Sequence, residues 1–221
     1  MRVARAQAHG FCAVEFHDDV LDEAPAVADA LHDARLPVVC LNTPKDLGAA
    51  IPGSEAAARD GIRRAIDCAN ALDAQAISVA AGVAEGPDAA VAFHDALRFG
   101  LDCSERQLLI EPICPAAMPG NFLHDVFQAA EIVDRLNDAR VGILFDVFHA
   151  AQIHGDAAQV FEQVAPAVGH VQIASLPARA APDNETFDLI RRIEAAGYDG
   201  PFGAEYISSD GGEDSGWMRL S

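Results

Sequence analysis

The sequence is poor in basic residues and has no long apolar run. Its 221 residues include 15 lysines and arginines against 34 aspartates and glutamates, a formal net charge of −19. A surface of that charge repels phosphate backbones and anionic lipid headgroups, so we expect neither a nucleic-acid partner nor a membrane partner. No apolar run reaches the ~18 residues that a membrane-spanning helix needs. The N-terminal MRVARAQAHG also lacks the apolar core of a signal peptide.

Cysteine pairs and nucleotide-binding loops are lacking as well. The five cysteines are scattered, odd in number and form no CxxC, which predicts reduced thiols in the cytoplasm. No GxGxxG or P-loop follows the first strand-like run, which weakens the case for a nucleotide-binding α/β sheet. No composition shift marks a linker, and 51% of the residues are hydrophobic. We therefore expect one packed domain over residues 1–221.

Short apolar, β-branched runs alternate with longer alanine-rich runs along the chain. This alternation predicts a parallel sheet covered by helices, either a doubly wound sheet or a (β/α)8 TIM-type barrel. A helix is expected first, over Arg2–Ala8. The expected strands are Cys12–Phe16, Pro37–Asn42, Ala76–Gly82, Gln107–Pro112, Val141–His149, Gly169–Ser175 and Pro201–Tyr206. The expected helices between them are Asp22–Arg35, Ser54–Leu72, Asp88–Cys103, Phe122–Leu136, Ala157–Val164 and Glu185–Ala196.

The strand count is one short of a closed barrel. A helix precedes the first expected strand, and the segment after Tyr206 is short for a closing helix. We therefore expect a (β/α)8 barrel that lacks its first strand and has a short or absent last helix. Two strand edges would then be unpaired. Two hypotheses address these edges: a homo-oligomer closes the gap, or the true start of the chain lies upstream of Met1.

Four polar residues stand at the ends of successive expected strands. Glu111, Asp146, Gln172 and Glu205 are 35, 26 and 33 residues apart, about one strand–helix unit each. The carboxyl ends of strands in a parallel barrel are where ligands gather. Three carboxylates meet there only if a cation or a proton relieves their repulsion, and all-oxygen ligands favour Mg²⁺ or Mn²⁺ over Zn²⁺. The alternative is that each acid only caps a helix or anchors a loop.

Several short motifs occur together in the second half of the chain. The stretches LLIEP, FDVFH, HVQIASLPAR and GAEY resemble the hydroxypyruvate isomerase family, within the xylose isomerase-like TIM barrels. The resemblance is strongest between Leu108 and Trp217. It implies one divalent metal held by Glu111, Asp146, Gln172 and Glu205, an acid/base pair in Glu111 and Glu205, and substrate contacts from His149 and Arg179.

These residue types suit aldose–ketose isomerisation. The reaction moves a proton between adjacent carbons through an enediolate, whose charge a chelated cation stabilises. A carboxylate on each face can take and return the proton, and Arg179 is a suitable partner for a substrate carboxylate. We therefore expect a divalent-metal-dependent isomerase acting on a small hydroxy-oxo acid such as hydroxypyruvate.

The loop after Arg179 departs from the family pattern. Family members usually carry Arg-His-Glu-Pro there, whereas this chain reads Arg179-Ala180-Ala181-Pro182, and a family histidine near the fourth barrel strand is Ser78. One alternative is a sugar epimerase of the same superfamily, although such epimerases typically have histidine where Gln172 stands. Others are a non-catalytic degenerate barrel and a metal-dependent nuclease, which the charge of −19 disfavours.

Overall fold

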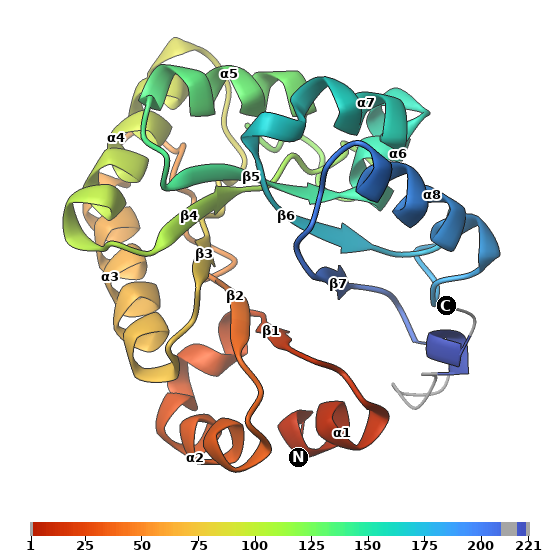
Figure 1. Ribbon diagram of the computed structural model, residues 1–221. Helices are drawn as coiled ribbons and strands as arrows, with labels where there is room; N and C mark the ends of the chain where they lie inside the picture. Colours follow the sequence, from red (N-terminus) through yellow and green to blue (C-terminus); the bar gives the residue numbers. More distant parts are fainter. Residues whose placement is uncertain (1, 209–215, 220–221) are drawn as a thin grey trace.

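Seven parallel strands, hydrogen-bonded in chain order, form the centre of the molecule (Figure 1). The computed structural model describes residues 2–208 and 216–219. The seven expected strands are confirmed, several of them shorter than predicted. They are β1 (Val14–Phe16), β2 (Val38–Asn42), β3 (Ala76–Ser78), β4 (Gln107–Ile110), β5 (Val141–Asp146), β6 (Val168–Ile173) and β7 (Phe202–Ala204).

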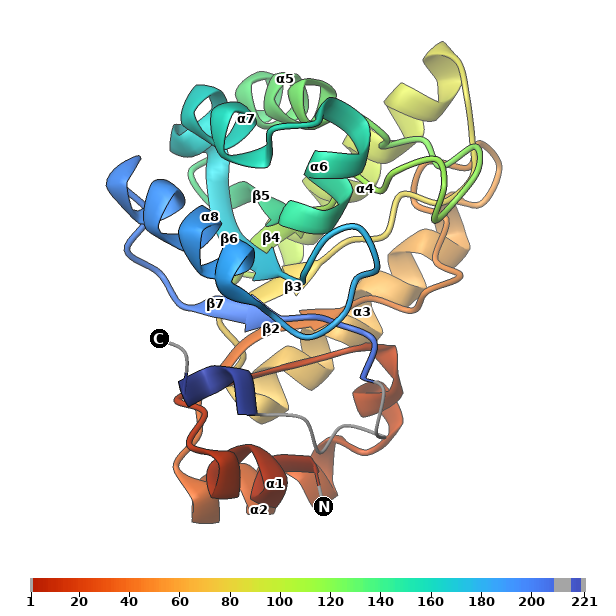
Figure 2. The same ribbon diagram turned by 90° about the vertical axis from the view of Figure 1, so that its right-hand side faces the viewer.

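Helices surround the curved sheet on its outer side (Figure 1). They are α1 (Arg2–His9), α2 (Ala24–Ala34), α3 (Glu55–Leu72), α4 (Pro87–Cys103), α5 (Val126–Leu136), α6 (Val147–His154), α7 (Ala157–Val164) and α8 (Asn184–Ala195), with 3-10 helices η1 (Asp18–Asp22), η2 (Ala165–Ala167) and η3 (Gly216–Arg219). Figure 2 shows α1 and α2 on the opposite side of the sheet from α5 and α7. None of the described helices combines the length and the apolar character needed to cross a bilayer.

Two apolar layers hold this arrangement. The large outer layer lies between sheet and helices, where the rings of Phe145 on β5 and Phe161 on α7 pack edge to face at 5.4 Å. A second, small cluster lies inside the barrel and comprises Cys40, Ala76, Leu109 and Leu144. Because side chains alternate along a strand, Leu109 shares its face with Glu111, and Leu144 shares its face with Asp146. The inner cluster is therefore the apolar floor beneath the predicted site.

One predicted strand ends early and is followed by a helix that the sequence did not indicate. The stretch Val141–His149 was expected to be one strand, yet β5 ends at Asp146 and α6 begins at Val147. Asp146 Oδ1 accepts the backbone N–H groups of Phe148 at 2.7 Å and His149 at 3.3 Å. This is the geometry of a helix N-cap, which satisfies donors that a helix start leaves unpaired. The cap turns His149 back toward the strand ends.

The barrel is nearly closed, with an opening between its first and last strands. Within the described residues β1 pairs with β2 and β7 with β6, and the two edges do not pair with each other (Figure 1). A cavity of about 320 Å³ lies there, with Phe16 and Phe202 among its lining residues. Over the described ranges 2–208 and 216–219, the structure thus confirms a TIM-type barrel with one strand too few. The predicted short or absent last helix falls partly on 209–215 and 220–221, outside the described residues.

Candidate metal centre and substrate pocket

The four strand-end residues lie at one end of the barrel. Glu111 follows β4, Asp146 ends β5, Gln172 lies in β6 and Glu205 follows β7. Asp146 and Gln172 are direct partners in the β5–β6 register, and the Glu205 N–H donates to the carbonyl oxygen of Ile173 at 3.1 Å. These backbone contacts bring together residues up to 59 positions apart, from 146 to 205. Their roles as metal ligands stay a prediction.

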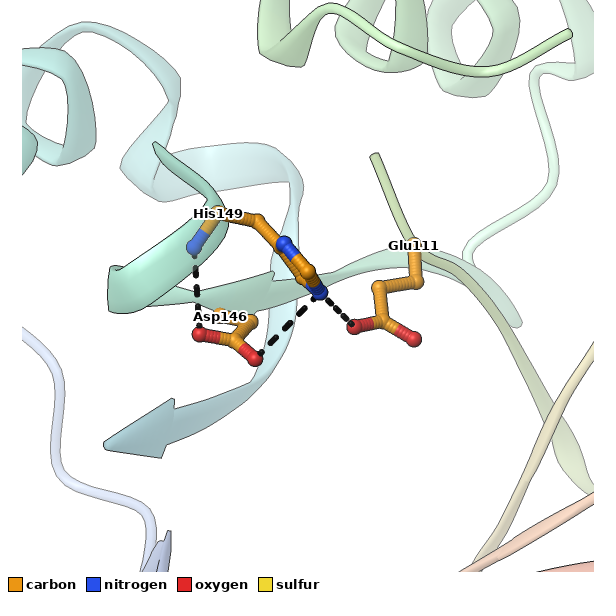
Figure 3. A group of neighbouring side chains, drawn as sticks. All are labelled: Glu111, Asp146 and His149. Atoms are coloured by element: carbon orange, nitrogen blue, oxygen red, sulfur yellow. Dashed lines mark hydrogen bonds and ion pairs between the residues drawn. The ribbon is translucent and has the colours of Figure 1, made fainter. Parts of the chain in front are cut away.

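His149 lies between two of the carboxylates (Figure 3). Its Nε2 is 3.7 Å from Glu111 Oε1 and 3.8 Å from Asp146 Oδ2. One ligand atom from each of the three residues falls within 4.8 Å of the others, a spacing that can hold a metal ion. Asp146 is the helix cap considered for it from the sequence, because Oδ1 caps α6, and its Oδ2 faces this cluster.

Arg179 supplies the positive charge of the site. It lies in the loop between β6 and α8, where the backbone N–H of Ser175 donates to the carbonyl oxygen of Ala180. Its Nη2 is 2.6 Å from Asp146 Oδ2 and 3.1 Å from Glu205 Oε2. Its guanidinium also lies over the ring of Phe148, 5.0 Å from the centroid. One arginine thus links two of the three carboxylates and is held in place by an aromatic face.

The contacts of His149 define its protonation. Arg179 Nη1 lies 3.0 Å from His149 Nε2, and a guanidinium can only donate. Nε2 must therefore accept, which puts the ring proton on Nδ1, facing Cys114 Sγ at 3.2 Å. The backbone N–H of Cys114 also approaches Nδ1, at 3.5 Å, but a neutral imidazole has only one acceptor nitrogen. We assign that acceptor to the shorter, charge-assisted contact with Arg179.

The acidic groups of the site carry more negative charge than Arg179 balances. Burial raises the pKa of Glu111 well above its usual range, and the charges of Glu205 and Asp146 raise it further. Burial also raises the pKa of Asp146 to about 6, against the opposing effect of Arg179. The pKa of His149 falls to about 4 through burial and the neighbouring Arg179. A further positive charge near Glu111 and Asp146 would favour the ionised forms of these two carboxyl groups.

Gln172 has a partner that the sequence analysis did not identify. Its Nε2 donates to Glu15 Oε1 at 3.2 Å, and the other carboxylate oxygen of Glu15 lies 2.9 Å from His170 Nε2. Gln172 Oε1 is buried and has no hydrogen-bond partner among the described residues. Two features of the sequence could have indicated this contact. Glu15 is an acid between apolar neighbours in the first strand, and His170 lies on the same strand face as Gln172.

This donor set fits a divalent cation. It offers three carboxylates and one buried amide oxygen without a hydrogen-bond partner among the described residues, and Arg179 contacts two of the carboxylates. Oxygen ligands of this kind are those that Mg²⁺ and Mn²⁺ prefer. His149 Nε2 lies beside these oxygens and 3.0 Å from Arg179 Nη1, and it is the one nitrogen donor of the group.

Comparison with known proteins agrees with the architecture. The family model of the xylose isomerase-like TIM barrel matches residues 3–220. A 2-oxo-tetronate isomerase from Cupriavidus necator is 31% identical over 99% of this chain and 91% of its own length. The hydroxypyruvate isomerase of Escherichia coli is 31% identical over 72% of this chain and 65% of its own length.

Solved structures place the fold in the same group. A crystal structure titled AP endonuclease, family 2, from Brucella melitensis has a TM-score of 0.87 and 32% identity, covering 94% of this chain and 87% of that one. The apo 3-keto-D-glucoside 4-epimerase of E. coli has a TM-score of 0.81 at 17% identity, covering 100% and 93%, which supports the fold alone. On the family match and these identities, the chain belongs to the xylose isomerase-like TIM barrel family.

Proposed function

We propose that this protein is a divalent-metal-dependent isomerase of a small hydroxy-oxo acid, with hydroxypyruvate and 2-oxo-tetronate as first candidate substrates. The observation that carries the proposal is the cluster itself. Glu111 and Asp146, both with raised pKa values, lie at the strand ends of the barrel together with Glu205 and the unpartnered amide oxygen of Gln172. Arg179 contacts Asp146 and Glu205. The isomerase names of the relatives support this choice of reaction.

Glu111 and Glu205 are the proposed acid/base pair. They come from β4 and β7, with β5 and β6 between them, so a small substrate can lie between the two carboxyl groups. For hydroxypyruvate, one carboxylate removes a proton from C3 and the other delivers one to C2. The hydroxyl proton moves from O3 to O2, which yields 2-hydroxy-3-oxopropanoate. The two carboxyl groups exchange these roles when the reaction runs in reverse.

Arg179 and His149 are the proposed substrate contacts. Arg179 presents a planar guanidinium suited to a carboxylate and is oriented by its stacking on Phe148. His149 is neutral near physiological pH because its pKa lies near 4. A neutral ring adds no positive charge and can hydrogen-bond a substrate oxygen once that oxygen replaces the Arg179 contact.

A divalent cation held by Glu111, Asp146, Gln172 and Glu205 would polarise the substrate carbonyl and hydroxyl oxygens and lower the energy of the enediolate. The net charge of −19 and the acidic pocket disfavour the nuclease alternative, because both repel a phosphate backbone.

Proton NMR of hydroxypyruvate with the purified protein and Mg²⁺ tests this function. We expect formation of 2-hydroxy-3-oxopropanoate, its loss when EDTA removes the metal, and its loss in Glu111→Gln and Glu205→Gln. Glu162→Gln, on the exposed face of α7, is the matched control and should retain activity. If neither hydroxypyruvate nor 2-oxo-tetronate reacts while Mg²⁺ binds normally, the substrate assignment is wrong.

A further inference from the structure

Glu15 makes a side-chain connection across the opening of the barrel. It lies on β1, an edge strand, yet its carboxylate contacts two residues of β6 that are 155 and 157 positions away. The strand between them in space, β7, carries Gly203 at this point. A Cβ at position 203 would lie 2.4 Å from Glu15 Oε1, so only glycine leaves room for the carboxylate.

The hydrogen-bond partners of Glu15 determine which groups donate and which accept. A carboxylate that is ionised can only accept hydrogen bonds. Its Oε2 therefore accepts from His170 Nε2–H at 2.9 Å, and its Oε1 accepts from the Gln172 amide nitrogen at 3.2 Å. On the far side of His170, Nδ1 lies 3.5 Å from the hydroxyl of Tyr198. Both carboxylate oxygens thus have a defined donor on β6.

This arrangement determines the orientation of an otherwise ambiguous amide. The two ends of a glutamine amide are similar in size, and a flip exchanges an acceptor for two donors. With an acceptor-only group on one side, the Gln172 nitrogen must face Glu15, and the oxygen must face the other way. That oxygen is the buried, unpartnered Oε1. A flipped amide would instead place an N–H group at this buried position, where it would repel a cation.

We propose that Glu15 is a positioning residue that holds the Gln172 amide with its oxygen toward the cation. The inference rests on the proposed function, since it assigns Gln172 Oε1 to the metal. Partners behind a metal ligand fix its orientation, and their loss typically weakens metal binding about 10–100-fold. Gly203 contributes to the same arrangement, because its lack of a side chain leaves the space that the Glu15 carboxylate occupies.

Calorimetric titration with Mn²⁺ of the full-length parent, Glu15→Gln and Gly203→Ala tests the proposal. Glu15→Gln can turn its NH₂ toward Gln172 and allow the flip, so we expect binding to weaken about 10–100-fold. Gly203→Ala displaces the carboxylate without changing any charge, so a similar loss there excludes a purely electrostatic effect. Glu162→Gln removes the same charge from the exposed face of α7 and should bind as the parent does.

Repeating Glu15→Gln and Gly203→Ala in a Gln172→Glu background distinguishes a loss of amide orientation from a general disruption of the site. A carboxylate at position 172 has two equivalent oxygens and needs no orientation, so Glu15→Gln and Gly203→Ala should no longer weaken Mn²⁺ binding there. Equal losses in both backgrounds, or no loss in the parent background, would overturn the role of Glu15. If the parent itself binds no Mn²⁺, the proposed function fails together with this inference. Urea unfolding of each variant checks that the barrel is intact.

Discussion

Arg179 Nη2 donates a hydrogen bond to Asp146 Oδ2 over 2.6 Å, and the Asp146 side chain is only 1% exposed. The same nitrogen lies 3.1 Å from Glu205 Oε2. A residue from a loop therefore supplies the positive charge that links the carboxylates at the ends of two strands, β5 and β7. In the proposed function, stability of the site and recognition of an anionic substrate depend on the same guanidinium.

Replacing Arg179 with methionine tests this dual role. The change leaves Asp146 and Glu205 without their positively charged partner, so we expect the metal-free protein to lose about 1–3 kcal/mol of unfolding free energy. This loss is smaller than that expected on breaking a fully buried ion pair, because Arg179 and Glu205 are partly exposed. The stabilisation by Mn²⁺ should be larger than in the parent, since the metal then supplies the missing charge. Thermal unfolding with and without Mn²⁺ measures both. An Mn²⁺ effect smaller than that of the parent would contradict this interpretation.

Glu111→Gln should stabilise the metal-free protein in a pH-dependent manner. Burial and two neighbouring acids raise the pKa of Glu111 in the folded state, so the folded protein holds this proton more tightly than the unfolded chain does. Stability contributed by the protonated form is present at low pH and is lost as pH rises through the folded pKa.

We therefore expect Glu111→Gln and the parent to unfold at similar temperatures near the unfolded glutamate pKa of about 4.3, with the variant increasingly more stable toward about pH 8. The predicted difference is of the order of 1–2 kcal/mol, or about 2–8 °C in the midpoint for a chain of this size. Calorimetric scans over that range in EDTA measure it. A constant difference at all pH values would argue against a raised pKa.

His149 should be neutral, with its proton on Nδ1. Its pKa of about 4 reflects burial and the nearby Arg179, and Arg179 Nη1 occupies the Nε2 side at 3.0 Å. Nitrogen-15 NMR of the imidazole identifies the protonated nitrogen directly. We expect the Nδ1–H form to persist from neutral pH down to about pH 5.5. An Nε2–H signal would contradict the assignment.

The two roles of Asp146 can be separated by two substitutions. Asparagine is as good an N-cap as aspartate, so Asp146→Asn should keep α6 capped but lose the carboxylate of the site. Asp146→Ala loses both, and we expect about 1 kcal/mol less unfolding free energy than for Asp146→Asn. Neither variant should show Mn²⁺ stabilisation. Chemical unfolding with and without Mn²⁺ checks this, and retained Mn²⁺ stabilisation in Asp146→Asn would exclude Asp146 as a ligand.

The sequence allowed the order and direction of the strands to be predicted because each strand is a short apolar run between helical segments. The grouping of Glu111, Asp146, Gln172 and Glu205 followed from the same alternation, since parallel strands end at one side of a barrel. Helix α6 was missed because Val147 and Phe148 continue the apolar run of β5 and only the cap by Asp146 ends the strand.

The contact between Glu15 and Gln172 was not predictable from local pattern. It joins residues 157 positions apart across the opening of the barrel, and its geometry depends on the absence of a side chain at Gly203. The position of Arg179 among the carboxylates was likewise set by the conformation of a loop rather than by strand periodicity. Such non-local polar contacts depend on the assembled barrel.

Thermal unfolding of the parent and of Glu205→Ala, each with and without Mn²⁺, tests the metal centre most directly. A ligand at about 100 times its dissociation constant adds roughly 2.7 kcal/mol, which corresponds to a rise of about 5–10 °C in the midpoint. We predict that rise for the parent and little or none for Glu205→Ala. Equal shifts in the two proteins, or no shift in the parent, would contradict a cation site built from these four residues.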